Sequence, residues 1–452
     1  DSDPSNYVDA AVYFCDQEYI TVRNLEVTND AEALADRMGI HFDAKAKTDG
    51  KAGRYVNYRG LTVENCYVHD IASDHTNGEH ARMAAIITWS RNWYASFSDV
   101  LIQNNEIANA DSCGIYMSGH SPAGAGTGNR ILNNYLHDIG GNGIITIECV
   151  APLVEYNVVS NSHYLSTQHC VAFWPFGCED ATFRFNEAYG TKTAIDGQGL
   201  DCDYQCTGTL FEYNYAHDND GGFILICCEP TTWDGKFAYN DNIVVRYNIG
   251  QNNGGGNGAQ IQLTGQIKNT TVYNNTLYVP WGYNSDIVST YSKDNVCYPD
   301  NTRFYNNLIY SYSGGAYTFL EATNTVWENN AFFGKHHSTE PDDPYKLTDD
   351  PRVVNPGGAD VGLDSCGAYA LYNDSPLIGA GKSVDVSSSG FTNCGEDFFG
   401  NPVISTQAPN IGAYNGAGVA DSSRPHYWEN RYKTLYSWEE NDIIDDPSKY
   451  ES

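Results

Sequence analysis

Three segments, VLIQNNEIAN (100–109), RILNNYLHDI (130–139) and PLVEYNVVSN (152–161), share one pattern: a short apolar strand, then Asn, then a second short strand. The apolar positions hold Val, Ile, Leu and aromatic residues, which fit pleated surfaces. The same pattern occurs in 11 segments, from ITVRNLEV (20–27) to TVWENNAFFG (325–334). Self-similarity at this period is the signature of a solenoid, in which each repeat buries its apolar face against its neighbours.

Nine consecutive segments hold Asn in the same column, at positions Asn105, Asn134, Asn157, Asn186, Asn214, Asn248, Asn275, Asn307 and Asn330. The first two segments place Asn24 and Asn65 one residue earlier. Asn tolerates left-handed backbone geometry at a bend, and stacked Asn side chains satisfy one another as an amide ladder. The column spacings run from 23 to 34 residues. We therefore predict an all-β fold, a right-handed parallel β-helix solenoid of about 11 coils.

The repeat pattern fades after about residue 335, where the sequence becomes rich in Asp, Pro and Gly. We expect the β-helix domain, with any catalytic site, over 1–335, and C-terminal coils and loops that close the β-helix over 336–415. An acidic, aromatic-rich tail would follow over 416–452.

Each coil contains a third apolar run, in which alternation decides which side chains face the core. If Leu200 and Ile261 point inward, an outward row results that is polar and aromatic, as the floor of a groove would be. Its members are Tyr116, Trp174, Asp201, Asp203, Gln260 and Gln262. Ile145, Ile147, Ile224 and Ile226 fit this row poorly, which leaves the register of two coils open.

The chain carries 25 Lys and Arg against 57 Asp and Glu, a net charge of −32. Such a surface repels nucleic acid and anionic polysaccharides, so a neutral substrate is favoured. The acidity is equally explained by the solubility of an extracellular protein. No run of 18 apolar residues is present, so we expect no membrane span. The chain begins at Asp1, and we expect a processed or trimmed protein whose signal peptide has been removed, located outside the cell or at its surface. A preceding segment or partner chain is therefore expected to be missing.

Thirteen cysteines are present, several of them inside apolar strand runs. An odd number leaves at least one thiol without an intrachain disulfide. Reduced cysteines buried between coils are the favoured interpretation, and disulfides remain an alternative.

The segment DGQGLDCD (196–203) places three carboxylates within eight residues. Asp201 and Asp203 share one face of a strand, and Asp196 lies across a Gly-rich bend that can fold back toward them. Carboxylates this close raise one another's pKa, so that one can be protonated while another is ionised. Cleavage of a glycosidic bond needs that combination. A structural calcium site, or polar capping of the turn, is the alternative, and no cofactor is required.

Further residues around this segment are predicted to bind a sugar. Trp174 on the preceding coil can stack on a sugar ring, although a Trp that covers the edge of the core is equally compatible. The other predicted substrate-binding residues are Asp201, His169, Glu229, Gln262 and Gln260. The recurring pairs His69-Asp70, His137-Asp138 and His217-Asp218 occupy one repeat position, which indicates a structural role in the turn.

Four motifs carry a resemblance to a known family: WPFGC (174–178), FNEA (185–188), DGQGLDCD (196–203) and FEYNYAHDNDGGFILICC (211–228). Over about residues 10–415 the chain resembles the right-handed β-helix glycoside hydrolases of the lacto-N-biosidase type. The resemblance implies that Asp196 is the general acid/base and Asp203 the nucleophile of a retaining mechanism. It also implies an exo-acting enzyme that releases a disaccharide such as lacto-N-biose from milk-type oligosaccharides.

The sequence thus predicts an extracellular glycoside hydrolase of neutral oligosaccharides. Two alternatives remain. One is a polysaccharide lyase or epimerase on the same fold, and the other is a non-catalytic glycan-binding surface module.

Overall fold

The computed structural model describes residues 9–45, 56–76, 82–90, 95–119, 126–192, 195–229, 232–233, 236–237, 239–256, 258–291, 297–319 and 322–420. They form two compact units. Unit 1 comprises the described residues up to 179 together with 191, 192 and 195–197, and unit 2 those of 180–190 and 198–420. The boundaries predicted at 335 and 415 stay a prediction, and the tail from 421 onward lies outside the described residues.

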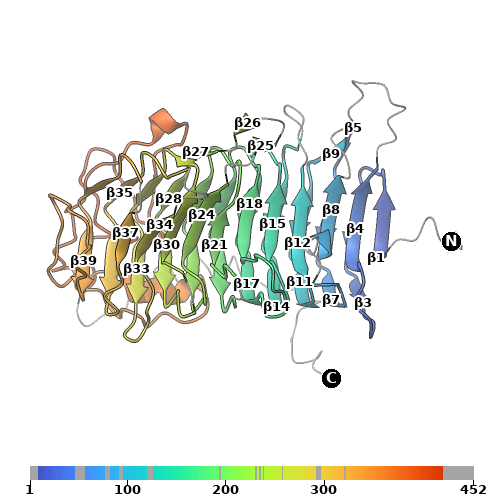
Figure 1. Cartoon of the computed structure of the whole chain (residues 1–452), viewed down its shortest axis with the longest axis horizontal. Coiled ribbons are helices and arrows are strands. Elements are labelled where there is room, and N and C mark those ends of the chain that lie inside the picture. The colour runs from blue at the N-terminus through green and yellow to red at the C-terminus, as the bar shows by residue number, and fades with distance from the viewer. Residues whose placement is uncertain are drawn as a thin grey trace, which may run out of the picture. The chain divides into compact units, whose positions relative to one another are not determined.

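Unit 1 consists of three parallel sheets, in which strands from successive coils lie side by side (Figure 1). The first sheet contains β1 (Ala10–Cys15), β4 (Met38–Ala44), β8 (Ala84–Ser90), β12 (Cys113–Ser118), β15 (Ile144–Ile147) and β18 (Phe173–Phe176). The second contains β2 (Thr21–Arg23), β6 (Thr62–Glu64), β10 (Leu101–Gln103), β13 (Arg130–Leu132) and β16 (Leu153–Glu155). The third contains β3 (Glu26–Asn29), β7 (Tyr67–Ile71), β11 (Glu106–Ala110), β14 (Tyr135–Ile139) and β17 (Val158–Ser162). A short pair, β5 (Val56–Arg59) and β9 (Ala95–Ser98), stands apart from these sheets.

Unit 2 repeats the three sheets. The first contains β21 (Leu200–Cys202), β24 (Ile224–Cys228), β30 (Ile261–Gly265), β34 (Val288–Tyr291) and β37 (Tyr317–Phe319). The second contains β19 (Thr182–Arg184), β22 (Leu210–Glu212), β28 (Val244–Arg246), β32 (Thr271–Tyr273), β35 (Arg303–Tyr305) and β38 (Val326–Glu328). The third contains β20 (Glu187–Tyr189), β23 (Tyr215–His217), β29 (Ile249–Gln251), β33 (Thr276–Val279), β36 (Leu308–Ser311) and β39 (Ala331–Gly334).

Two short strand pairs and two 3-10 helices complete unit 2. The strand pairs are β25 (Thr232–Trp233) with β26 (Lys236–Phe237), and β27 (Asn240–Asp241) with β31 (Ile267–Lys268). The helices are η3 (Leu363–Tyr369) and η4 (Ser387–Ser389). Each of the three sheet positions is filled by 11 strands along the chain. Parallel pairing between strands one coil apart, repeated in all three positions, confirms the parallel β-helix and its 11 coils.

The amide ladder is present in both units. In unit 1, Asn105 Nδ2 donates to Asn134 Oδ1 over 2.9 Å, and Asn134 Nδ2 donates to Asn157 Oδ1 over 2.9 Å. In unit 2 the ladder runs without interruption from Asn186 to Asn330, with amide-to-amide distances of 2.9 to 3.0 Å. Within these two runs the buried amides therefore satisfy one another and the adjoining backbone.

The structure corrects the reason for the Asn column. The left-handed residue of each bend is the one before the ladder Asn, for example Asn133 with φ 53° and Tyr213 with φ 59°. Asn24 and Asn65 occupy this left-handed position, with φ of 56° and 51°. Ladder and bend are therefore two adjacent positions with different requirements. The ladder needs an amide, and the bend needs a residue that tolerates positive φ.

The His-Asp pairs hold neighbouring coils together, as their recurrence indicates. Each Asp has positive φ, and in each pair one His ring nitrogen contacts this Asp while the other contacts a Glu one coil earlier. His137, for example, lies 2.9 Å from Asp138 and 3.2 Å from Glu106. Burial opposes the charged ring, but the two carboxylates outweigh it and raise the pKa of His137 to about 9.

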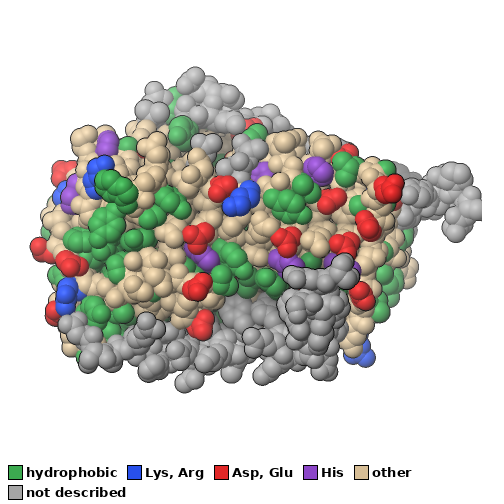
Figure 2. Space-filling model, turned by 90° about the horizontal axis from the view of Figure 1, so that it is seen from below, with side chains coloured by type: hydrophobic (Ala, Val, Ile, Leu, Met, Phe, Trp, Pro, Cys, Tyr) green, Lys and Arg blue, Asp and Glu red, His purple; other side chains and the backbone are tan. Residues whose placement is uncertain are grey.

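The surface seen in Figure 2 carries scattered Asp and Glu side chains and few Lys or Arg, in keeping with the net charge of −32. No helix in the described part of the chain is long and apolar enough to cross a membrane. All thirteen cysteines are thiols, and ten of them are buried. This agrees with the favoured interpretation of reduced cysteines between the coils.

Candidate active site

The outward row of the first sheet in unit 2 begins at Asp201. Asp201 lies opposite Leu225, and Leu225 lies opposite Gln262. The neighbouring residues Leu200, Ile224 and Ile261 form the inward row, which is fully buried. Because strand side chains alternate, Asp201, Leu225 and Gln262 lie on the opposite face of the sheet, where Asp201 and Leu225 are also buried and Gln262 is half-buried. Ile224 therefore belongs to the core, which settles the open register of this coil.

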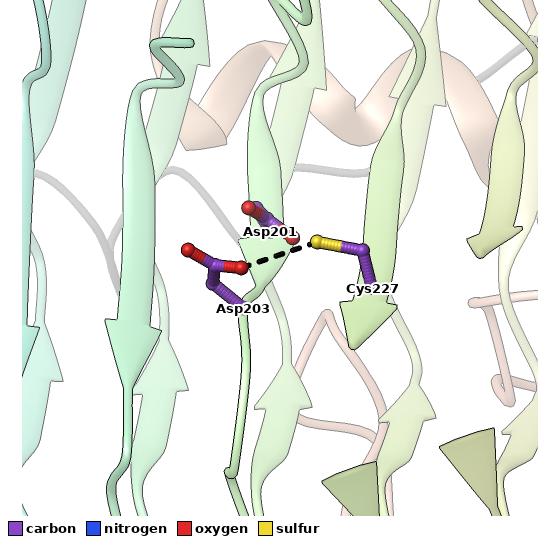
Figure 3. A group of neighbouring side chains, drawn as sticks. All are labelled: Asp201, Asp203 and Cys227. Atoms are coloured by element: carbon purple, nitrogen blue, oxygen red, sulfur yellow. Dashed lines mark hydrogen bonds between the residues drawn. The ribbon is translucent and has the colours of Figure 1, made fainter. Parts of the chain in front are cut away.

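Asp201 and Asp203 extend from one face of β21 and its continuation, and Cys227 points toward them from β24 (Figure 3). Their ligating atoms all lie within 4.8 Å of one another. The Cys227 Sγ donates to Asp203 Oδ1 over 3.2 Å, and the backbone N–H of Tyr204 donates to the same oxygen over 2.8 Å. Asp201 is only 5% exposed. Asp201 is thus nearly desolvated, whereas Asp203 is half-buried and held by two donors.

Tyr204 and Cys227 are site residues that the sequence did not single out. Burial raises the pKa of Tyr204, and the nearby Cys227 and Asp203 raise it further. A hydrogen bond between Tyr204 and Glu229 acts in the same direction. The phenol is therefore neutral, a hydrogen-bond donor beside three acidic groups. Their positions are the feature by which both residues could have been predicted. Tyr204 directly follows Asp203, and Cys227 lies on β24, the strand adjacent to β21.

Unit 1 holds Asp196, His169 and Trp174. Asp196 has φ of 69° and bridges to Cys170, whose carbonyl accepts a hydrogen bond from Gly197 N–H. The His169 Nδ1 lies 2.9 Å from Asp196 Oδ2, and the His169 side chain is 73% exposed. His169 therefore meets Asp196 at the surface.

Two buried groups also surround Asp196. Burial raises the pKa of the Cys170 thiol to about 12, and the Asp196 charge acts in the same direction. Burial lowers the pKa of His163, and Asp196 opposes that shift. The Asp196 carboxylate is thus close enough to Cys170 and His163 to influence the pKa of both.

The remaining predicted residues fall in distinct places. Trp174 is half-buried, and its indole N–H donates to Asn142 Oδ1 over 2.8 Å. Glu229 is half-buried directly after β24. Gln262 is half-buried on the outward row, where its Nε2 donates to Thr264 Oγ1 over 3.3 Å. Asp196 and Asp203 belong to different units, so their pairing as acid/base and nucleophile stays a prediction.

The prediction that Gln260 faces outward is wrong. Gln260 is fully buried, and its amide donates to Asn253 O over 2.6 Å and to Ser285 Oγ over 3.0 Å. The residue precedes β30, which begins at Ile261; its backbone carbonyl accepts from Phe223 N–H and its N–H donates to Asp286 O, both on neighbouring coils. Alternation counted back from Gln262 therefore does not extend to position 260.

Comparisons with known proteins agree with the fold. A family model described as a right-handed β-helix region matches residues 10–188, which confirms the predicted handedness over that part. The crystal structure of XylC in complex with xylose covers 84% of this chain and 67% of its own, with 13% identity and a TM-score of 0.52. Such a likeness establishes the fold alone.

A curated lacto-N-biosidase of Bifidobacterium longum subsp. longum is 27% identical over 496 aligned residues. The match covers 88% of this chain, but the chain spans only 29% of that relative's length. The crystal structure of a GH136 lacto-N-biosidase from Eubacterium ramulus is 21% identical, covers 62% of this chain and 49% of its own, and has a TM-score of 0.47. The sequence match confirms the resemblance to lacto-N-biosidase that the four motifs indicated.

Proposed function

We propose that this chain, a parallel β-helix protein similar to lacto-N-biosidase, carries the catalytic carboxylates of a glycoside hydrolase that acts on neutral oligosaccharides. In this proposal Asp203 is the nucleophile and Asp196 the general acid/base of a retaining mechanism. The enzyme acts on chain ends and releases a disaccharide such as lacto-N-biose from milk-type oligosaccharides.

The observation that carries the proposal is the environment of Asp203. Its Oδ1 accepts from Tyr204 N–H over 2.8 Å and from Cys227 Sγ over 3.2 Å. Donors on a carboxylate favour its ionised form and fix its orientation, and both are needed for attack on an anomeric carbon. The adjacent Asp201 carboxylate, within 4.8 Å, adds negative potential, which stabilises an oxocarbenium-like transition state.

The surroundings of Asp196 fit a proton-transfer role. His169, 73% exposed, reaches Asp196 Oδ2 over 2.9 Å, so the carboxyl is near solvent and in contact with a group that can itself gain or lose a proton. A general acid/base must exchange its proton with water between the two halves of a retaining cycle. A surface-accessible partner supports that exchange.

The lyase or epimerase alternative has less support. Such enzymes bind anionic sugars, whereas Asp201, Asp203 and Glu229 add negative charge to the candidate site. Calcium is likewise poorly matched, because calcium prefers oxygen ligands and the carboxylate cluster contains the Cys227 thiol. A neutral sugar is not repelled by these carboxylates and does not require calcium at the site.

Two leaving groups test the roles of the carboxylates. Asp203→Asn should lower kcat/KM at least about 10³-fold on both p-nitrophenyl and dinitrophenyl disaccharide glycosides, because the nucleophile is absent. Asp196→Asn should lose about 10²- to 10⁴-fold on the p-nitrophenyl glycoside, and its glycosylation step should lose far less on the dinitrophenyl one, whose leaving group needs no proton.

Asp180→Asn is the matched control. Asp180 is exposed and has φ of 52°, a conformation that Asn adopts readily, so this change should leave kcat/KM unaltered. Wild-type activity that survives both catalytic substitutions would refute the assignment.

A further inference from the structure

A polar cavity lies between the second sheet of unit 2 and the C-terminal loop that carries η4. We call it the second-sheet cavity. Its volume is about 450 Å³, within the range of about 300–1,000 Å³ that is usual for ligand sites. Every residue that lines it is polar, and the carboxylate cluster of the candidate active site is not part of it. The lining residues are Asn242, Asn269, Thr271, Asn301, Arg303, Ser388 and Ser389.

The sheet side of the second-sheet cavity is built by the repeat. Its three asparagines share one position, two residues before a strand of the second sheet, and each has positive φ. The φ values are 61° at Asn242, 52° at Asn269 and 56° at Asn301, in the left-handed region that Asn tolerates. Thr271 and Arg303 are the first residues of β32 and β35, and they lie opposite each other in register. The cavity therefore spans successive coils.

The amides of these asparagines have a fixed orientation. Asn269 Nδ2 donates to Asp241 Oδ1 over 2.7 Å, and Asn301 Nδ2 donates to Asn269 Oδ1 over 2.7 Å. Because an ionised carboxylate only accepts, this chain of bonds leaves Asn301 Oδ1 as an acceptor. Asn242 Nδ2 donates to Ser389 O, which leaves Asn242 Oδ1 as a second acceptor. Neither oxygen has a hydrogen-bond partner among the residues that the structure describes.

Arg303 adds donors to the same cavity. Its half-buried side chain donates from Nη1 to Tyr305 Oη over 3.2 Å and forms no ion pair within the described part of the chain. The N–H groups of Nε and Nη2, which form one edge of the guanidinium, are therefore available to a ligand. This is unusual in a chain with 57 Asp and Glu and 25 Lys and Arg. A guanidinium edge matches two neighbouring oxygen atoms.

The combination of donors and acceptors favours a neutral polyhydroxylated ligand. Neighbouring hydroxyl groups of a sugar offer oxygens to the Arg303 edge and hydrogens to the oxygens of Asn242 and Asn301. A sulfate or phosphate ion would satisfy Arg303 but has no hydrogen for the two amide oxygens. Asp241, bonded to the lining residue Asn269, also repels an anion.

We propose that the second-sheet cavity is a further binding site, which takes a neutral saccharide, separate from the carboxylate cluster. Arg303 and the Thr271 hydroxyl are among the groups that hold the sugar. The site holds saccharide without cleaving it, and it needs neither Asp196 nor Asp203, so it goes beyond the proposed function.

The test is a titration of the full chain, labelled with ¹⁵N at arginine, with lacto-N-biose. The NMR signal of Arg303 Nε–H, identified by its absence from Arg303→Met, should shift and saturate. Thr271→Val removes one hydroxyl at nearly constant volume, so the affinity measured at this signal should fall about 2- to 10-fold. An Arg303 signal that does not move, or an affinity that Thr271→Val leaves unchanged, overturns the proposal.

Arg130 is the matched control. It is the first residue of β13, as Arg303 is of β35, but it does not line the second-sheet cavity. Its Nε–H signal, identified with Arg130→Met, should not shift with lacto-N-biose. Equal shifts at Arg130 and Arg303 would show unspecific contact with the sugar and contradict a built site.

Two further measurements separate the remaining outcomes. A titration with sodium sulfate tests the class of ligand, because an Arg303 signal that saturates with sulfate and not with lacto-N-biose would make the cavity an anion site and overturn the proposal. Hydrolysis of p-nitrophenyl disaccharide glycosides is assayed on the same protein. Saturation at Arg303 without hydrolysis supports the second-sheet cavity and contradicts the proposed function, whereas hydrolysis with an unmoved Arg303 signal does the reverse.

Discussion

The outward row of the first sheet has a different chemical character in the two units. In unit 1 it is mostly apolar and aromatic, and consists of His41, Ile87, Tyr116, Ile145 and Trp174. In unit 2 it is mostly polar, and consists of Asp201, Leu225, Gln262, Ser289 and Thr318. The inward rows are alike, with Ile115, Ile144 and Phe173 in one unit and Leu200, Ile224 and Ile261 in the other.

The difference shows that the scaffold constrains only the inward row. Core packing demands apolar residues in the inward row of both units, and the ladder demands Asn from Asn105 onward, whereas the outward row can vary without loss of the coil. In unit 1 this freedom is used for a second apolar layer, in which Ile145 and Tyr116 are buried. In unit 2 it is used for carboxylates and amides.

The largest effect on stability is expected when a residue of the outward row in unit 1 is replaced by the type of residue found in the outward row of unit 2. Ile145→Asp places a carboxylate in the apolar cluster formed with Met38, Ile87 and Tyr116. An uncompensated buried charge costs about 3–5 kcal/mol, so the free energy of unfolding should fall by that amount. Urea unfolding measures it. A loss below about 1 kcal/mol would show that the outward row of unit 1 tolerates polar residues as unit 2 does.

The ladder should respond alike in both units. Asn248→Leu removes the acceptor of Asn214 N–H and Nδ2 and the donor to Asn275 Oδ1, and Asn134→Leu does the same in unit 1. Each leaves buried groups unsatisfied, and we expect losses of about 2–4 kcal/mol for both. A loss confined to one unit would contradict a common scaffold.

A smaller effect on stability is expected from pH, through the His-Asp pairs that link neighbouring coils. The pKa of His137 in the folded protein is about 9, above its unfolded value of about 6.5. Its contribution is therefore complete below about pH 6.5 and is lost as the pH rises through 9. We expect about 1–2 kcal/mol after discounting for partial exposure. The difference in unfolding free energy between wild type and His137→Gln should shrink over this range. A constant difference would contradict a stabilising role of charged His137.

The smallest effect on stability is expected when a carboxylate in the outward row of unit 2 is replaced by an apolar residue. Asp201→Leu gives position 201 the residue that already stands at Leu225, the next position in the row. Replacing a buried charge by an apolar side chain is often neutral, so stability should change by less than about 1 kcal/mol. Hydrolysis should fall, since Asp201 adds charge to the site. Full activity would remove Asp201 from the proposed mechanism.

Much of the fold was predictable because ladder and core repeat in the sequence. The Asn column from Asn105 to Asn330 marks nine of the 11 coils, and Leu200 and Ile261 indicate the inward face of the first sheet. The bend residue was not predictable, because positive φ occurs both at an amide residue, Asn133, and at the aromatic residues Phe185 and Tyr213.

The candidate site was predictable only in part. The acidic segment stands out against apolar strands, so Asp201 and Asp203 were found. Cys227 and Tyr204 were not, because contacts across coils depend on loop lengths that set which residues become neighbours. The prediction that Gln260 faces outward was wrong because side chains alternate only within a strand, and position 260 lies before β30.

The most direct test of the central claim is a covalent trap. A retaining enzyme with Asp203 as nucleophile should form a stable adduct with a 5-fluoro disaccharide glycosyl fluoride, because the fluorine slows hydrolysis of the glycosyl-enzyme. Mass spectrometry of the digested protein should place one sugar adduct on Asp203 and none in the Asp203→Asn variant. An adduct on another carboxylate, or turnover of activated glycosides with no adduct at all, would contradict the account.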